Sequence, residues 1–135
     1  MRTLLLLGAA VGLATAANAQ NTASSSQTGT DHEAIITQTG SNTATLTQTG
    51  ATNEGVIDQI GGDNEAVLDQ SGSGNYGEIA QPSGGSATNT YATVTQSGTD
   101  GKVWIDQGRD ANGVAENSSA DVEQGGADNV VYVTQ

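Results

Sequence analysis

The chain has no cysteine and no phenylalanine, a single proline, and only three basic residues in 135 positions. Without cysteine it can form no disulfide, and it offers no thiolate to a metal. Three basic residues against 15 acidic ones leave no positive cluster for nucleic acid or an anionic membrane surface. Aromatic residues make up 3% of the chain, so there is little material for an ordinary globular core. Composition alone would favour disorder.

Residues 1–19 are typical of a secretory signal. Arg2 supplies a positive start, residues 4–16 an apolar stretch, and Ala17-Asn18-Ala19 a small-residue cleavage site. A transmembrane anchor needs roughly 20 apolar residues, which this stretch lacks. We therefore expect cleavage after Ala19 and a secreted product, with no membrane insertion.

A repeated pattern argues against disorder. The seven-residue motif Asn-x-small-x-aliphatic-x-Gln recurs, usually at intervals of eleven residues. Its good copies are residues 42–48, 53–59, 64–70, 75–81 and 129–135, and weaker copies lie at 32–38, 90–96, 101–107 and 118–124. Repeats of fixed period are typical of architectures in which each unit buries its apolar face against its neighbours.

Each copy alternates with a period of two, which predicts a strand, and a glycine in each connection allows a tight reversal. Strand, turn, strand, turn gives about 22 residues per rung, and stacked rungs lie ~4.8 Å apart. We predict an all-β fold: a cross-β, amyloid-forming β-solenoid with two strands per rung over residues 32–135. Residues 20–31, rich in serine and threonine, are expected to be disordered. Residues 82–89 should form a bulged loop, and two registers remain open within residues 108–118.

Asparagine and glutamine of each copy share the face that points into the solenoid. A primary amide can donate to the copy above it and accept from the copy below it, so stacked amides can form ladders. The residues expected to form these ladders, and to carry self-assembly, are Gln38, Asn42, Gln48, Asn53, Gln59, Asn64, Gln70, Asn75, Gln81, Gln96, Gln107, Gln124, Asn129 and Gln135.

The extended motif Gln-x-Gly-x-x-Asn-x-Ala-x-x-x-Gln resembles the curlin repeat of curli subunits. Residues 59–70 match it at every defined position, residues 48–59 and 70–81 match with glycine for alanine, and residues 124–135 match with valine. The resemblance implies a subunit of a functional amyloid that passes an outer-membrane curli secretion channel. It also implies that copies of the chain polymerise at the cell surface into fibres of the curli pilus type. These fibres would belong to the biofilm matrix and serve adhesion and aggregation, and a minor subunit would nucleate them. Whether this chain resembles the major or the nucleating subunit stays open.

No catalytic constellation is apparent, so we expect neither an enzyme nor a cofactor. His32 is the only histidine and stands where other copies have asparagine, which favours a structural role. A transition-metal site lacks a ligand set, and the glycine- and aspartate-rich turns lack the spacing of calcium-binding repeats. Tyr76, Tyr91, Trp104 and Tyr132 fall on outward positions, where isolated aromatics need no explanation. The alternative to a fibre subunit is a monomeric, secreted β-solenoid binding module for ions or a surface ligand.

Overall fold

The structure, a computed structural model, describes residues 10–14, 20–81, 87–108 and 117–135. These residues form ten strands, and all the strand pairs are parallel. The strands are β1 (Ala10–Ala14), β2 (Thr22–Thr30), β3 (Glu33–Ala51), β4 (Glu54–Ser73), β5 (Tyr76–Gln81), β6 (Ala87–Thr88), β7 (Tyr91–Thr99), β8 (Lys102–Asp106), β9 (Ser119–Gln124) and β10 (Val130–Thr134). Nowhere in these ranges is there a helix of the length and hydropathy needed to cross a membrane.

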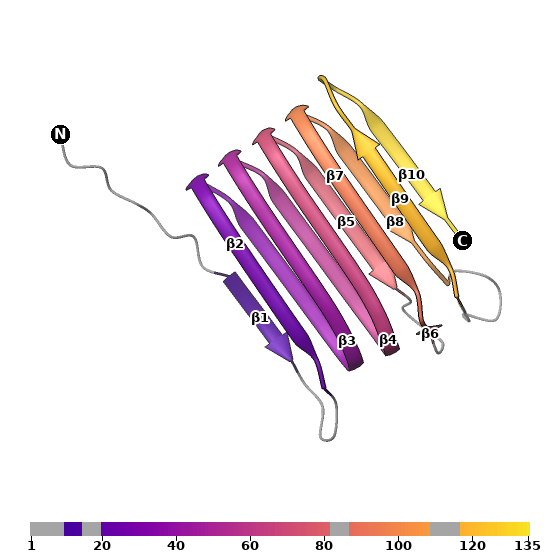
Figure 1. Cartoon of the computed structure of the whole chain (residues 1–135). Helices are drawn as coiled ribbons and strands as arrows, with labels where there is room; N and C mark the ends of the chain where they lie inside the picture. The colour runs from indigo at the N-terminus through magenta and orange to yellow at the C-terminus, as the bar shows by residue number, and fades with distance from the viewer. Residues whose placement is uncertain (1–9, 15–19, 82–86, 109–116) are drawn as a thin grey trace.

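The strands stack on two faces that enclose a thin core. Face A consists of residues 33–38, 54–59, 76–81, 102–106 and 130–134, and face B of residues 22–27, 43–48, 65–70, 91–96 and 119–124. The long strands β3 and β4 each run along face A and then along face B. We call residues 21–38 the first rung and residues 118–135 the last rung, and these lie at opposite ends of the stack (Figure 1).

The rungs lengthen toward the C-terminus. Equivalent glutamines in successive rungs are separated by 21, 22, 26 and 28 residues, and the same series holds on both faces. The predicted β-solenoid with two strands per rung and about 22 residues per rung is therefore confirmed.

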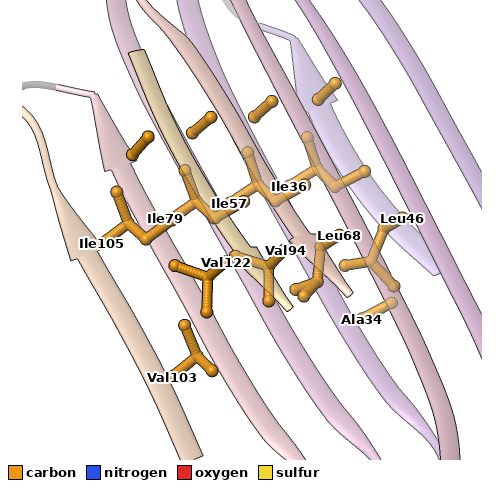
Figure 2. Close-up of a cluster of buried hydrophobic side chains, with 14 residues drawn as sticks. Ala34, Ile36, Leu46, Ile57, Leu68, Ile79, Val94, Val103, Ile105 and Val122 are labelled. Carbon is orange, nitrogen blue, oxygen red and sulfur yellow. The ribbon is translucent and has the colours of Figure 1, made fainter. Parts of the chain in front are cut away.

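Two rows of aliphatic side chains face each other across the interior. Face A contributes Ile36, Ile57, Ile79 and Ile105, and face B contributes Leu46, Leu68, Val94 and Val122 (Figure 2). The central members of both rows are fully buried. Burying one such side chain stabilises a fold by about 1.5–3 kcal/mol. Each rung contributes only a thin layer of apolar side chains from each face, but the layers stack along the axis and together form a continuous core.

The corners of the solenoid require glycine. Gly50 has a φ of 117°, and a Cβ atom placed on it would lie 1.9 Å from the carbonyl oxygen of Gly72 in the next rung. A side chain there would collide with backbone that cannot move independently. The glycine of the motif is thus fixed by its backbone conformation and by the close approach of stacked corners.

The structure corrects the expectation of a disordered segment over residues 20–31. Residues Thr22–Thr30 form β2, which pairs in register with residues 43–51 of β3. Asn21, Ala23 and Gln27 occupy the motif positions, with Ser25 where other copies have an aliphatic residue. The repeat therefore begins one copy earlier than the sequence pattern indicated.

Several expectations touch residues outside the described ranges. Of the expected signal over residues 1–19, residues 1–9 and 15–19 lie outside the described ranges. The remaining residues form β1, which pairs with residues 34–38 of β3. Of the expected bulged loop over residues 82–89, residues 82–86 lie outside the described ranges. Between the two registers left open at residues 108–118, Ser119–Gln124 is the segment that stacks on residues 91–96.

Candidate functional site

Glutamine side chains form one continuous ladder inside each face. On face B, Nε2 of Gln27, Gln48, Gln70 and Gln96 each donates to Oε1 of the next glutamine, ending at Gln124. On face A, Gln38, Gln59, Gln81 and Gln107 do the same, ending at Gln135. The N–O distances are between 2.8 and 3.1 Å. These bonds join every rung to the next, independently of the backbone.

In every ladder glutamine after Gln27, an N–H of the carboxamide donates to a backbone carbonyl of the other face. Nε2 of Gln70 donates to the carbonyl oxygen of Glu54 at 2.9 Å, and Nε2 of Gln96 donates to that of Tyr76 at 2.9 Å. A carbonyl oxygen can only accept, so this contact fixes which end of the amide is the nitrogen. Because every rung repeats the contact, both ladders run in one direction, with Nε2 pointing toward the C-terminal end of the stack.

The structure buries most of the residues singled out from the sequence. Gln38, Asn42, Gln48, Asn53, Gln59, Asn64, Gln70, Asn75, Gln81, Gln96, Gln107 and Gln124 are all buried. Asn129 and Gln135 are exposed because they lie on the last rung, which has no neighbour beyond it.

The asparagines do not pair amide to amide, which corrects the expectation of asparagine ladders. The Oδ1 atom of Asn53 instead accepts from the backbone N–H of Asn75 at 3.0 Å, and Oδ1 of Asn75 accepts from that of Gly101 at 3.0 Å. Their Nδ2 atoms donate to the corner carbonyls of Thr49 and Ser71. The next rung thus supplies only a backbone group, which explains how glycine can replace asparagine at position 101.

The ends of the ladders differ in a way that matters for assembly. In the first rung, Oε1 of Gln27 and Oε1 of Gln38 are buried and accept no hydrogen bond from the described residues. In the last rung, Nε2 of Gln124 and of Gln135 donates to the carbonyls of Lys102 and Ser119, which leaves each with one N–H unused among the described contacts. Acceptors are left over at one end and donors at the other.

Sequence reasoning missed Asn21 and Gln27. Oδ1 of Asn21 accepts from the backbone N–H of Asn42 at 2.9 Å, and Nε2 of Gln27 starts the ladder of face B. Their spacing of six residues, with Ala23 between them, was the available signal.

Three aromatic side chains meet on the outside of face A. The rings of Tyr76 and Trp104 have centroids 5.3 Å apart, and those of Trp104 and Tyr132 are stacked at 4.6 Å. These outward aromatics are therefore not isolated. The hydroxyl of Tyr76 donates to Glu78 at 2.7 Å. Partial burial, and then the bond to Glu78, raises the pKa of Tyr76 above its usual value.

Among the described residues, no group of three or more histidine, cysteine, aspartate or glutamate side chains lies close enough together to hold a metal ion. The pKa of Asp58 is raised by partial burial and by the nearby charge of Glu78.

Residues 41–72 and residues 63–98 each match the family model of the curlin associated repeat. This chain contains curlin associated repeats. The matched stretches contain the central rungs, in which the repeat's glutamines form the ladders and its glycines form the corners. Curlin-repeat geometry continues beyond the matches into both end rungs, since β2 and β10 keep the same register. A search of curated proteins found no match to the chain.

Proposed function

We propose that the chain is a secreted structural subunit that polymerises with copies of itself into extracellular, curli-type amyloid fibres. The curlin repeat and the β-solenoid together support a curli-type structural subunit. The proposal adds that growth proceeds by templated strand addition: the last rung of one copy receives the first rung of the next, and backbone and side-chain hydrogen bonds continue across the junction.

The single observation that carries this proposal is the mismatch between the two ends of each ladder. In the chain that still carries β1 beside Gln38, Oε1 of Gln27 and of Gln38 are buried amide oxygens without a described partner, and such an atom costs about 1–3 kcal/mol. Removal of residues 1–19 leaves both acceptors on the open edge of the first rung. The unused N–H groups of Gln124 and Gln135 lie in the same columns, at the other end of the stack. Head-to-tail addition satisfies both sets, whereas head-to-head addition would place acceptor against acceptor.

The proposed role is structural: the proposal includes neither a catalytic activity nor a cofactor. We further propose that residues 1–19 are removed on export, that an outer-membrane curli secretion channel carries the chain, and that a minor subunit nucleates the fibre. Fibres of this kind would serve adhesion and aggregation within a biofilm matrix. The curlin repeat is the observation that supports these proposed partners.

The test is polymerisation of the purified chain beginning at Gln20. Every side-chain hydrogen bond of the two ladders joins residues within Asn21–Gln135, so this chain keeps them all. We expect seedable, sigmoidal growth followed by thioflavin fluorescence, and fibre reflections near 4.7 and 10 Å. A folded β monomer that stays monomeric would overturn the proposal and support a binding module.

Gln135→Ala tests the ladder itself. It removes the donor at the growing end and should slow elongation from wild-type seeds. Thr134→Ala, at the neighbouring outward position, is the matched control and should elongate like the wild type. Equal slowing by both variants would contradict a specific role for the carboxamide.

A further inference from the structure

The exposed apolar side chains of the outer surface are not scattered. Among the described residues, the large hydrophobic side chains that are exposed are Ile35, Tyr91, Val130 and Tyr132. Three of these four lie on face A in an end rung: Ile35 in the first rung, Val130 and Tyr132 in the last. Tyr132 is 70% exposed and Ile35 is 38% exposed.

Tyr132 and Ile35 occupy the same outward column. Register along face A pairs Ile35 with Val56, Val56 with Glu78, Glu78 with Trp104, and Trp104 with Tyr132. A further rung beyond the last would continue this column. The uncovered side of the Tyr132 ring, opposite Trp104, is where the side chain of that further rung would pack.

We propose that the occupant of this position is Ile35 of a second copy, so that the outer column of face A joins adjacent subunits. This inference rests on the proposed head-to-tail assembly and names the side chains that hold its junction. In a chain beginning at Gln20, which lacks β1 beside Ile35, the contact covers two apolar groups that one copy leaves in solvent. An aromatic ring against a β-branched side chain is a favourable pair between neighbouring strands.

Apolar contact selects this frame over the alternative. When face A continues onto face A, Tyr132 meets Ile35, Val130 meets Glu33 and Thr134 meets Thr37. A copy rotated by half a turn about the fibre axis would place Tyr132 against Ser24 and Ile35 against Asp121, so neither exposed apolar side chain would gain an apolar partner. Each frame places one carboxylate beside an aliphatic side chain, as Val56 and Glu78 already lie within one copy, so charge does not distinguish the two. The glutamine ladders cannot make this choice, because both faces carry the same carboxamide.

Paired cysteines can report the frame, since the natural chain has none. Thr37→Cys with Thr134→Cys, in a chain beginning at Gln20, places the two thiols on adjacent rungs across the junction, about 4.8 Å apart by strand spacing. This lies within the range of Cα separations that a disulfide spans. Within one subunit the two positions are four strand spacings apart, roughly 19 Å, so no internal bond can form.

We expect mild oxidation of the fibres to give disulfide-linked multimers of the Thr37→Cys/Thr134→Cys chain on denaturing gels. The Thr37→Cys/Glu123→Cys chain, which reports the half-turn frame, should stay monomeric on the same gel. Crosslinking of the second pair at the level of the first would overturn the inference.

Removal of the contact gives a second measurement. Ile35→Ser and Tyr132→Ser, each alone, should slow elongation by about tenfold, the effect expected for loss of one well-packed apolar contact. Tyr91→Ser changes an exposed aromatic on face B in the rung before the last, which does not reach the junction, and this matched control should grow at the wild-type rate. Slowing by Tyr132→Ser alone would indicate a loosened last rung and would overturn the contact.

Failure of the contact and failure of assembly are distinguishable. A chain that forms no seedable fibre overturns the proposed function and this contact with it. Fibres that form while Ile35→Ser grows at the wild-type rate overturn the contact alone.

Discussion

The Nδ1 atom of His32 accepts a hydrogen bond from the backbone N–H of Asn53 at 3.3 Å, where other rungs use the Oδ1 atom of an asparagine. Its Nε2 atom lies 3.1 Å from the carbonyl oxygen of Thr28, the corner group that an asparagine Nδ2 atom would reach. In this arrangement Nδ1 is the acceptor and Nε2 faces a carbonyl oxygen, which can only accept. The imidazole therefore reproduces both contacts of the asparagine it replaces.

This equivalence predicts that His32→Asn retains stability within about 0.5 kcal/mol, whereas His32→Ala loses about 1–2 kcal/mol because two hydrogen bonds disappear. Urea unfolding of freshly prepared monomer measures both. A loss in His32→Asn as large as in His32→Ala would show that the ring contributes something other than these two bonds.

Gln70 occupies the centre of the face B ladder. Gln70→Ala removes its bonds to Gln96 and to the carbonyl of Glu54 and deprives Gln48 of an acceptor, so the free energy of unfolding should fall by about 2–4 kcal/mol. Thr95→Ala, at an exposed position of β7, is the control for a polar loss on the outer surface and should change stability little. Comparable losses in both would argue against the ladder as a source of stability.

Ser25 lies in the aliphatic row of face B, and its hydroxyl is buried without a hydrogen-bond partner among the described residues. Ser25→Val should stabilise the first rung by about 1 kcal/mol, because it removes an unsatisfied polar group and adds apolar contact with the row of Leu46. Ser24→Val changes the adjacent, outward residue and serves as the control. A higher urea midpoint is expected for Ser25→Val only; a lower one would contradict this account of the row.

Asp58 gives the fold a dependence on pH. Its pKa is raised in the folded chain by burial and by the charge of Glu78, so folding favours the uncharged carboxyl. The stability from this group is complete below the ordinary aspartate pKa of 3.8 and is lost as pH rises through the folded-state pKa. Asp58→Asn should therefore raise stability at pH 7 and flatten the decline between acid and neutral pH in urea titrations.

The control for this pH effect is Asp121→Asn, which makes the same change of charge at an exposed position of face B. It should leave the slope of stability against pH close to that of the wild type. Identical slopes for wild type and Asp58→Asn would exclude Asp58 as the source.

Strand β1 pairs with residues 34–38, the edge that the last rung of a neighbouring copy would occupy in the proposed fibre. A chain that keeps residues 1–19 should therefore elongate seeds more slowly than one beginning at Gln20. Gly12→Pro removes a backbone donor within β1 and should restore part of the rate to the longer chain. Equal rates for the long and short chains would show that β1 does not compete with subunit addition.

The sequence predicted the solenoid and the inward glutamines because both follow from periodicity. Alternation by two places Gln48 and Leu46 on one face, and the eleven-residue interval brings Gln48 above Gln70. Composition could not show that Ser25 substitutes for an aliphatic residue, so β2 was missed. The contacts of Asn53 depend on how far its short side chain reaches, and it reaches a backbone N–H but not another carboxamide. The stack of Trp104 on Tyr132 depends on a register set by a connection of ten residues rather than four.

The connections from face B to face A keep one length in every rung, while those from face A to face B lengthen from three residues after Gln38 to ten after Gln107. One lateral edge of the solenoid is thus invariant, and all variation in length is confined to the opposite edge. A foreign peptide placed in the longer connections would leave both ladders and both end rungs untouched. A polymer of this chain could then carry such cargo once per subunit along a single side.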